Sequence, residues 1–144
     1  MDDREDFVTS ERFPDADRLI KGSYDKLSDK IPAYENAYYV IVTRGHLGDS
    51  ACARPDPETP YTYLGMIGSK NKVKLTREKL LGEGFSEEQL NSIHAPIGLP
   101  IGGHMPAEIA VSIAAEIVQE KNRYDVSYID GAVEDAVRKK KMEL

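Results

Sequence analysis

The chain has 144 residues, of which 31% are charged and 40% hydrophobic, and its formal net charge at pH 7 is −6. This length suits one domain with a single core, and no apolar run is long enough to cross a bilayer. The negative charge argues against nucleic acid as a partner, and we find neither a membrane segment nor a signal peptide. A single cysteine, Cys52, excludes an internal disulfide framework and favours a reducing cytoplasm.

Strands and helices are predicted to alternate along the first half of the chain. After an acidic loop over 1–17, the predicted elements are a short strand at 18–22, a helix at 23–31 capped by Ser23 and ended before Pro32, and a strand at 36–45. The last of these, "NAYYVIVTRG", has the β-branched and aromatic character of a strand buried on both faces of a parallel sheet. Residues 46–60 begin as one helical turn and continue as a proline-broken loop, where we expect the most mobility.

The second half continues the same alternation. Its predicted elements are a strand at 61–69, a helix at 70–84, a short helix at 86–93 with a Ser86–Gln89 capping box, an irregular strand or loop at 94–103, a strong helix at 106–122 with Pro106 at its first position, and a loop with a weak helix at 123–144. We therefore divide the chain into a partial Rossmann-like domain, 1–125, and a C-terminal helical tail, 126–144.

This order of elements predicts an α/β fold: a Rossmann-like, three-layer arrangement around a parallel sheet. In such sheets ligands bind beyond the carboxyl ends of the strands. Three segments are expected to converge there, namely "VTRGHLGD", "IGSK" and "GLPIGGHMPAE".

Gly68, Ser69 and Lys70 lie where the second strand feeds a helix. Such a junction leaves backbone N–H groups free to bind an anion, with Ser69 as a further donor and Lys70 as a point charge. The spacing matches neither a phosphate-binding loop nor a dinucleotide fingerprint, so a plain turn capped by Ser69 remains the alternative. Gly102 and Gly103 precede the strong helix similarly and form a second candidate pocket, unless they only permit close chain approach.

Other polar residues have both a functional and a structural interpretation. His46, Asp49 and Cys52 are metal-ligand types spaced three apart, but a hydrogen-bonded loop explains them as well, and we predict no metal site. His46, at the end of a buried strand, could donate to an anion or move a proton. The lysines of the 70–84 helix are interpreted as a solvated face, and they are Lys70, Lys72, Lys74 and Lys79.

The segments "VIVTRGHLGD", "YLGMIGSKNK", "GFSEEQL" and "HAPIGLPIGGHMPAEIAVSIAAEIV" follow one another in the chain. With them, the sequence resembles the C-terminal Rossmann domain of the xanthine dehydrogenase accessory factor (XdhC/CoxI) family over Asp2–Asn122. The resemblance implies a cytoplasmic maturation protein that binds the molybdenum cofactor (molybdopterin), protects it and delivers it in sulfurated form. Its implied partners are a molybdenum hydroxylase apo-enzyme, a cysteine desulfurase and a phosphate-bearing small molecule.

Several features depart from the family pattern. The chain begins at a position that matches the end of the family's second strand, so the first βαβ unit, its glycine-rich loop and a separate N-terminal domain have no counterpart. We expect a fragment or short gene product; the alternative is that another chain supplies those strands. Asp2 and Asp3 correspond to the acidic position that can bond a ribose hydroxyl in a Rossmann fold. Arg44 replaces a histidine that the family often has, whereas His46 and Asp49 match.

The resulting hypothesis is a cofactor-handling accessory protein without catalytic residues of its own. Its cofactor-binding residues are predicted to be Asp3, His46, Asp49, Gly68, Ser69, Lys70, Gly102 and Gly103. One alternative is an NAD(P)-binding Rossmann oxidoreductase, against which stand the missing glycine-rich loop and the lack of a hydride-transfer motif. Another is a protein-interaction module in which exposed strand edges form a homodimer.

Overall fold

The computed structural model describes residues 1–54, 56 and 59–123. It forms two compact units, the first spanning Met1–Ile97 and the second beginning at Gly98. The predicted tail at 126–144 lies outside the described residues, so the 1–125 and 126–144 division stays a prediction. In the described part of the chain, no helix combines the length and the apolar character needed to cross a membrane.

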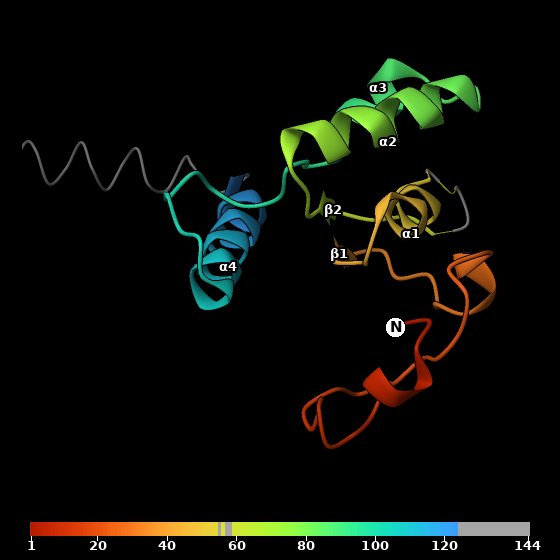
Figure 1. Ribbon diagram of the computed structural model, residues 1–144, viewed down its shortest axis with the longest axis vertical. Helices are drawn as coiled ribbons and strands as arrows, with labels where there is room; N and C mark the ends of the chain where they lie inside the picture. Colours follow the sequence, from red (N-terminus) through yellow and green to blue (C-terminus); the bar gives the residue numbers. More distant parts are fainter. Residues whose placement is uncertain (55, 57–58, 124–144) are drawn as a thin grey trace, which may run out of the picture. The chain divides into compact units, whose positions relative to one another are not determined.

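The first unit holds most of the regular structure (Figure 1). Its elements are the 3₁₀ helices η1 (Glu5–Phe7) and η2 (Leu27–Asp29), the strands β1 (Tyr38–Ile41) and β2 (Tyr63–Met66), and the helices α1 (His46–Cys52), α2 (Lys70–Gly82) and α3 (Glu87–Asn91). The second unit contains α4 (Pro106–Asn122).

β1 and β2 run parallel, with Tyr38 opposite Tyr63, and α1 connects them as a βαβ unit. The other side of β2 is also paired, because the N–H of His94 donates to the carbonyl of Leu64 at 2.9 Å and His94 forms a parallel bridge with Gly65. Within the described residues, β2 is therefore central and β1 lies at an edge of the sheet. The predicted α/β fold with a parallel sheet is confirmed, although the described residues contain only two full strands.

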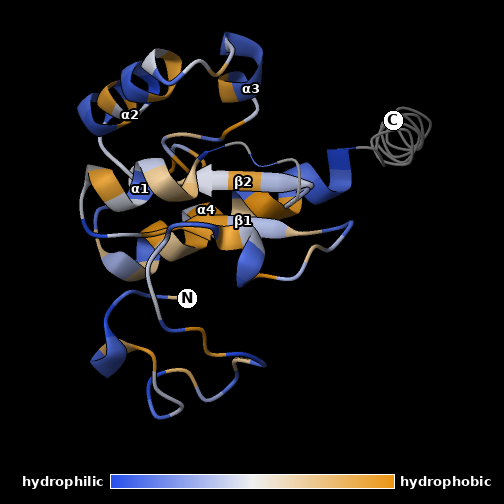
Figure 2. Cartoon of the chain, turned by 90° about the vertical axis from the view of Figure 1, so that its right-hand side faces the viewer, coloured by the Kyte–Doolittle hydropathy of each residue, from blue (hydrophilic) through white to orange (hydrophobic). Residues whose placement is uncertain are grey.

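The core lies mainly between the sheet and the helices that flank it (Figure 2). Its buried residues are Ile41, Ala53, Leu64, Met66, Val73, Leu80 and Leu90. All four residues of β2 are buried, as the sequence predicts for a strand covered on both faces. The same prediction is wrong for β1, where Val40 is 42% exposed and, of the four residues, Ile41 alone is buried.

The N-terminal region differs most from the predictions. Instead of a strand at 18–22, only one parallel bridge joins Lys21 to Asp2. The helix predicted at 23–31 is reduced to the three residues of η2, because Lys26 has a left-handed φ of +51° that an α-helix cannot continue. Ser23 instead makes a local turn, in which the N–H of Asp25 donates to its hydroxyl.

The remaining helices agree with their local signals. Ser69 caps α2 by accepting from the N–H of Lys72, and Ser86 and Gln89 form the predicted capping box of α3. α4 begins at Pro106 as expected. α1 extends for seven residues, longer than the single turn predicted, before the proline-rich stretch.

Candidate functional site

The loop after β1 turns sharply into α1. Gly45 has φ +91°, a backbone conformation that favours glycine. At Gly48 an added Cβ would lie only 2.7 Å from Oγ1 of Thr43. The absence of a side chain at Gly48 therefore lets α1 lie close to the loop that follows β1. His46 is the first residue of α1, which places its backbone at the carboxyl end of β1, as predicted.

Asp49 is completely buried in the first half of α1. Thr43 Oγ1 donates to its Oδ1 at 2.5 Å, and the ammonium of Lys72 on α2 forms an ion pair with its Oδ2. A buried carboxylate is tolerated only when it is paired in this way. The hydrogen bond from Thr43 and the ion pair with Lys72 thus satisfy the Asp49 carboxylate within this chain. The ion pair also holds the Lys72 side chain in place.

Cys52 lies at the other end of α1 and is partly buried. Burial, and secondarily the charge of Asp49, raises the pKa of its thiol to about 12. The thiol is therefore protonated near neutral pH, which makes it a poor nucleophile and a poor thiolate ligand. Among the described residues, no group of three His, Cys, Asp or Glu side chains is placed to hold a metal ion.

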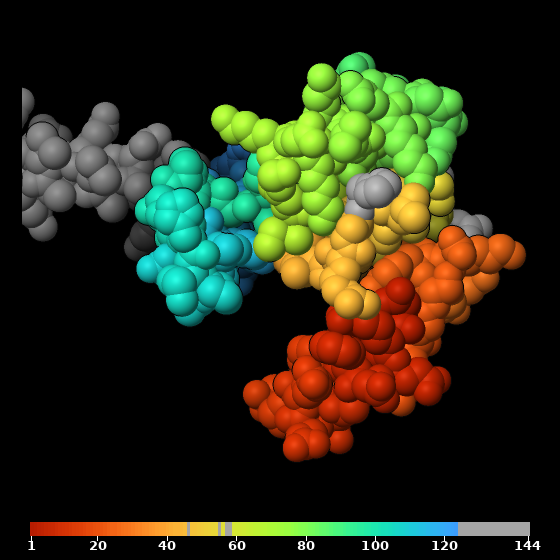
Figure 3. All heavy atoms as spheres, in the orientation of Figure 1, coloured from red at the N-terminus to blue at the C-terminus, as the bar shows by residue number. Residues whose placement is uncertain are grey.

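The start of α2 carries three of the predicted residues. Ser69 and Lys70 are exposed, and in Figure 3 α2 (yellow-green) presents an open side beside the golden-yellow atoms of α1. Because the first N–H groups of a helix have no partner within it, those of Lys70 and Asn71 are directed outward at the positive end of the helix dipole. Gly68 leaves room for Lys72, whose Cδ would be 3.2 Å from an added Cβ.

Asp3 lines a hollow of about 430 Å³ together with residues of the β1–α1 segment, including Arg44 and Gly48. Its Oδ1 accepts from the hydroxyl of Tyr24 at 3.3 Å. The neighbouring Asp2 has no such freedom, because Arg4 binds both of its carboxylate oxygens at 2.8 Å and holds its pKa well below the usual range. The structure thus brings Asp3 to the strand ends but engages Asp2 elsewhere.

Gly102 and Gly103 belong to the second unit. The carboxylate of Glu108 accepts from the N–H groups of His104 at 2.8 Å and Met105 at 3.0 Å, and these bonds lower its pKa. A Cβ on Gly103 would lie 2.6 Å from Cβ of Glu108. Two donors available to an anion are therefore taken by this chain's own carboxylate, and the geometry favours the close-approach interpretation of the glycines.

Sequence reasoning missed the role of two lysines. Lys72 and Lys79 were interpreted as solvated, yet Lys72 pairs with Asp49, and Lys79 Nζ donates to the hydroxyl of the buried Ser50 at 2.9 Å. Both contacts join α2 to α1. The available signal was the spacing of seven residues, two helical turns, which places the two lysines on one face of α2.

Comparisons with known proteins give consistent similarities. The model of the protein family described as "XdhC Rossmann domain" matches residues 1–117. A probable xanthine dehydrogenase component from Bacillus subtilis (strain 168) is 30% identical over 120 residues, which cover 83% of this chain and 34% of that protein. The uncharacterised YqeB of Escherichia coli (strain K12) is 45% identical over 65 residues, 45% of this chain and 12% of that protein.

A crystal structure of a xanthine dehydrogenase from Bacillus halodurans is also similar. It matches with a TM-score of 0.68 at 26% identity, covering 85% of this chain and 34% of that one. The chain thus spans about a third or less of the length of the relatives named here.

Proposed function

Because this chain belongs to the family of XdhC Rossmann domains, we propose that it supplies the phosphate-binding part of an accessory protein that serves a molybdenum hydroxylase of the xanthine dehydrogenase type. The names of the Bacillus relatives support the connection to xanthine dehydrogenase. Within this proposal, the accessory protein binds the molybdenum cofactor and delivers it to the apo-enzyme.

The observation that carries the proposal is the start of α2. Outward N–H groups, the exposed Lys70 and the positive end of a 13-residue helix meet at the carboxyl end of the central strand β2. Lys72, in the first turn of α2, is ion-paired with the buried Asp49, so Lys70 is the exposed cation at this position that Asp49 does not pair. Fixed donors and cations of this kind suit a phosphate group.

The described residues fit one end of the cofactor. Its phosphate would be held by the backbone N–H groups of Lys70 and Asn71, the hydroxyl of Ser69 and the ammonium of Lys70. Its head group would lie toward the hollow lined by Asp3 and the β1–α1 segment. When bound, the cofactor supplies molybdenum redox chemistry to the recipient enzyme, whereas the residues of this chain bind and orient it.

Titration calorimetry with molybdopterin tests this assignment. We expect the double variant Ser69→Ala, Lys70→Ala to lose about 1–3 kcal/mol of binding free energy, the range for charge-assisted hydrogen bonds. Lys74→Ala is the matched control, because Lys74 lies on the same helix, is exposed and pairs with Glu78 at 3.7 Å. Unchanged affinity of the double variant, with an unchanged circular dichroism spectrum, would contradict the assignment.

A nicotinamide dinucleotide is the second candidate. Asp3 favours it, because this carboxylate reaches the strand-end hollow at the acidic position that bonds a ribose hydroxyl in Rossmann folds. Titration with NAD⁺ and NADP⁺ under the same conditions separates the candidates. Binding of NAD⁺ that is lost in Asp3→Asn, without binding of molybdopterin, would favour a dinucleotide site.

A further inference from the structure

Asp49 binds two different segments that follow the strands of the sheet. Its Oδ1 accepts from the hydroxyl of Thr43, in the loop after β1, at 2.5 Å, and its Oδ2 is ion-paired with the ammonium of Lys72, in the first turn of α2. Both segments lie at the carboxyl ends of neighbouring parallel strands, where folds of this class bind their ligands. One buried carboxylate therefore joins the loop after β1 to the start of α2.

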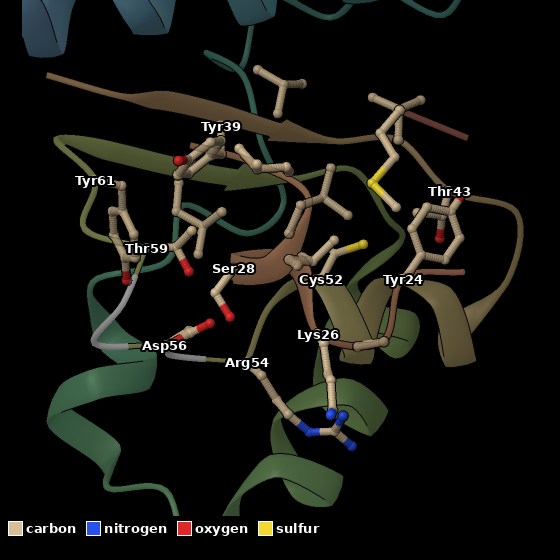
Figure 4. Close-up of a pocket in the computed structure, with 18 residues that line it drawn as sticks. Tyr24, Lys26, Ser28, Tyr39, Thr43, Cys52, Arg54, Asp56, Thr59 and Tyr61 are labelled. Atoms are coloured by element: carbon tan, nitrogen blue, oxygen red, sulfur yellow. The ribbon is translucent and has the colours of Figure 1, made fainter. Parts of the chain in front are cut away.

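The loop after β1 is fixed by its own hydrogen bonds. The carbonyl of Gly45 accepts from the hydroxyl of Thr43 at 3.3 Å and from the N–H of Asp49 at 3.4 Å. An added Cβ at Gly48 would lie 2.7 Å from Oγ1 of Thr43 and 3.3 Å from a ring carbon of Tyr24. Figure 4 shows Thr43 and Tyr24 together at one end of a cavity of about 550 Å³. Both side chains thus pack against α1 at the same point.

This loop also lines the hollow of about 430 Å³ that contains Asp3. Arg44 belongs to the loop and contributes to the lining, as does Tyr24, whose hydroxyl donates to Asp3 at 3.3 Å. Asp49 has no exposed surface and is not among the lining residues. It can therefore affect the hollow only through Thr43 and the loop.

Lys72 is held at both of its ends. Its backbone N–H donates to Oγ of Ser69 at 3.2 Å, and its ammonium binds Asp49. An added Cβ at Gly68 would lie 3.2 Å from Cδ of Lys72, so the lysine side chain passes close to the residue that precedes the helix cap. The first turn of α2, with the outward N–H of Lys70, is therefore tied to α1 by a side chain of that same turn.

Two further contacts join α2 to α1 and to the residues just after it. Lys79 Nζ donates to the hydroxyl of Ser50 at 2.9 Å, and Nε of Arg54 is 2.8 Å from a carboxylate oxygen of Glu83. Lys79 lies two helical turns beyond Lys72, and Glu83 follows the end of α2. These contacts involve neither the loop after β1 nor the first turn of α2, so they offer a control.

We propose that Asp49 is a positioning residue, which holds the loop that lines the hollow and the first turn of α2 at a fixed spacing for the two ends of one ligand. This inference rests on the proposed function, in which the phosphate lies at the start of α2 and the head group toward the hollow. Because Asp49 is buried, it acts through Thr43 and Lys72 and does not touch the ligand. Donors that are in place before binding lose less freedom when the ligand arrives.

Charge alone makes the opposite prediction for the variant Asp49→Asn. Removing a negative charge and releasing the ammonium of Lys72 would strengthen the attraction for a phosphate. Loss of the fixed spacing would weaken binding instead, so the direction of the change in affinity distinguishes the two roles. Thr43→Val removes the hydroxyl that binds Asp49 and changes no charge, whereas Thr43→Ser keeps this hydroxyl.

Titration calorimetry of the full chain with molybdopterin measures the affinity, and urea denaturation measures the stability of each variant. We expect Asp49→Asn and Thr43→Val to bind roughly fivefold more weakly than the wild type, and Thr43→Ser to bind within about twofold of it. Lys79→Met is the matched control and should lose stability while binding within about twofold of the wild type, because its contact with Ser50 lies away from the strand ends. If Asp49→Asn does not fold by circular dichroism, the two Thr43 variants carry the test.

Three results would overturn the positioning role while the proposed function stands, because the wild type binds in each of them. They are tighter binding by Asp49→Asn, equal affinity of Thr43→Val and Thr43→Ser, and a loss of affinity in Lys79→Met as large as that in Thr43→Val. If the wild type itself does not bind molybdopterin, the proposed function is contradicted and the positioning role fails with it.

Discussion

The ion pair between Asp49 and Lys72 joins the start of α1 to the start of α2 across a buried position. Asp49 has no exposed surface, so its charge depends on Lys72 and on the hydroxyl of Thr43. Removing one partner of such a pair leaves an uncompensated charge in a medium of low polarity. Asp49, which the sequence predicts to bind a cofactor, thus has a structural role as the buried partner of Lys72.

We expect Lys72→Met to lower the free energy of unfolding by about 3 kcal/mol, because the Asp49 carboxylate would stay buried without its cation. Urea denaturation at pH 7 measures this loss. Lys74→Met is the control and should change stability by less than about 0.5 kcal/mol, since Lys74 is 72% exposed at its side chain. Equal effects of the two substitutions would show that the pair contributes nothing specific.

The thiol of Cys52 should react slowly with dithionitrobenzoate at pH 8. Its pKa in the folded chain is raised to about 12 by burial, so little thiolate is present. A typical small domain is unfolded in about 8 M urea. In that solution the pKa of the Cys52 thiol should return toward its ordinary value, and the reaction should accelerate. The same shift means that stability linked to Cys52 is present below pH 9 and is lost as pH rises toward 12. Equal rates in the folded and unfolded chain would contradict this environment.

At the scale of single elements, β2 depends on a glycine. A Cβ at Gly65 would collide with the side chain of Ile97 and lie 2.7 Å from the hydroxyl of Tyr63. Gly65 is also the residue that bridges to His94. Ile97 can therefore pack closely against β2 only because Gly65 has no side chain.

We expect Gly65→Ala to destabilise the chain by about 1–3 kcal/mol through overpacking. Thermal unfolding followed by circular dichroism measures it. Gly82→Ala serves as the comparison, because an added Cβ there meets no atom within 4 Å and alanine favours a helix. A fall in melting temperature for Gly82→Ala as large as that for Gly65→Ala would refute the packing argument.

For the whole molecule, several carboxylates are bound by groups of the same chain. The pKa of Glu83 is lowered by its hydrogen bond with Arg54, that of Glu108 by the N–H groups of Met105 and His104, and that of Asp2 by Arg4. A lowered pKa in the folded state contributes stability above the ordinary value, and this contribution is lost as pH falls. The ordinary values are 4.5 for the glutamates and 3.8 for the aspartate.

The urea midpoint should therefore be nearly constant between pH 7 and 5, and should fall between pH 5 and pH 3. The variant Glu83→Gln, Glu108→Gln should have a smaller fall over the acid range, since two of the linked groups no longer titrate. An acid-induced fall of the same size in this variant would assign the pH dependence to other carboxylates.

Local signals in the sequence determined most helices and the family. Ser69 caps α2, Ser86 and Gln89 begin α3, and Pro106 begins α4, all as predicted, because each signal acts within a few residues of its helix. The strands predicted at 36–45 and 61–69 were also found as β1 and β2, since continuous β-branched and aromatic runs are rare elsewhere, whereas the strand predicted at 18–22 is only a single bridge. The segment at 23–31 was predicted wrongly, because Lys26 adopts a left-handed backbone conformation that no local pattern indicated.

Only the tertiary structure decided which polar groups remain available at the candidate site. Lys72 and Asp49 lie far apart in sequence, and nothing in either local pattern shows that they neutralise each other. The exposure of β1 is a second example. Its local pattern predicts a strand buried on both faces, whereas Val40 is 42% exposed in the folded chain. Capping and strand propensity depend on adjacent residues, whereas pairing, burial and open edges depend on residues that folding brings together.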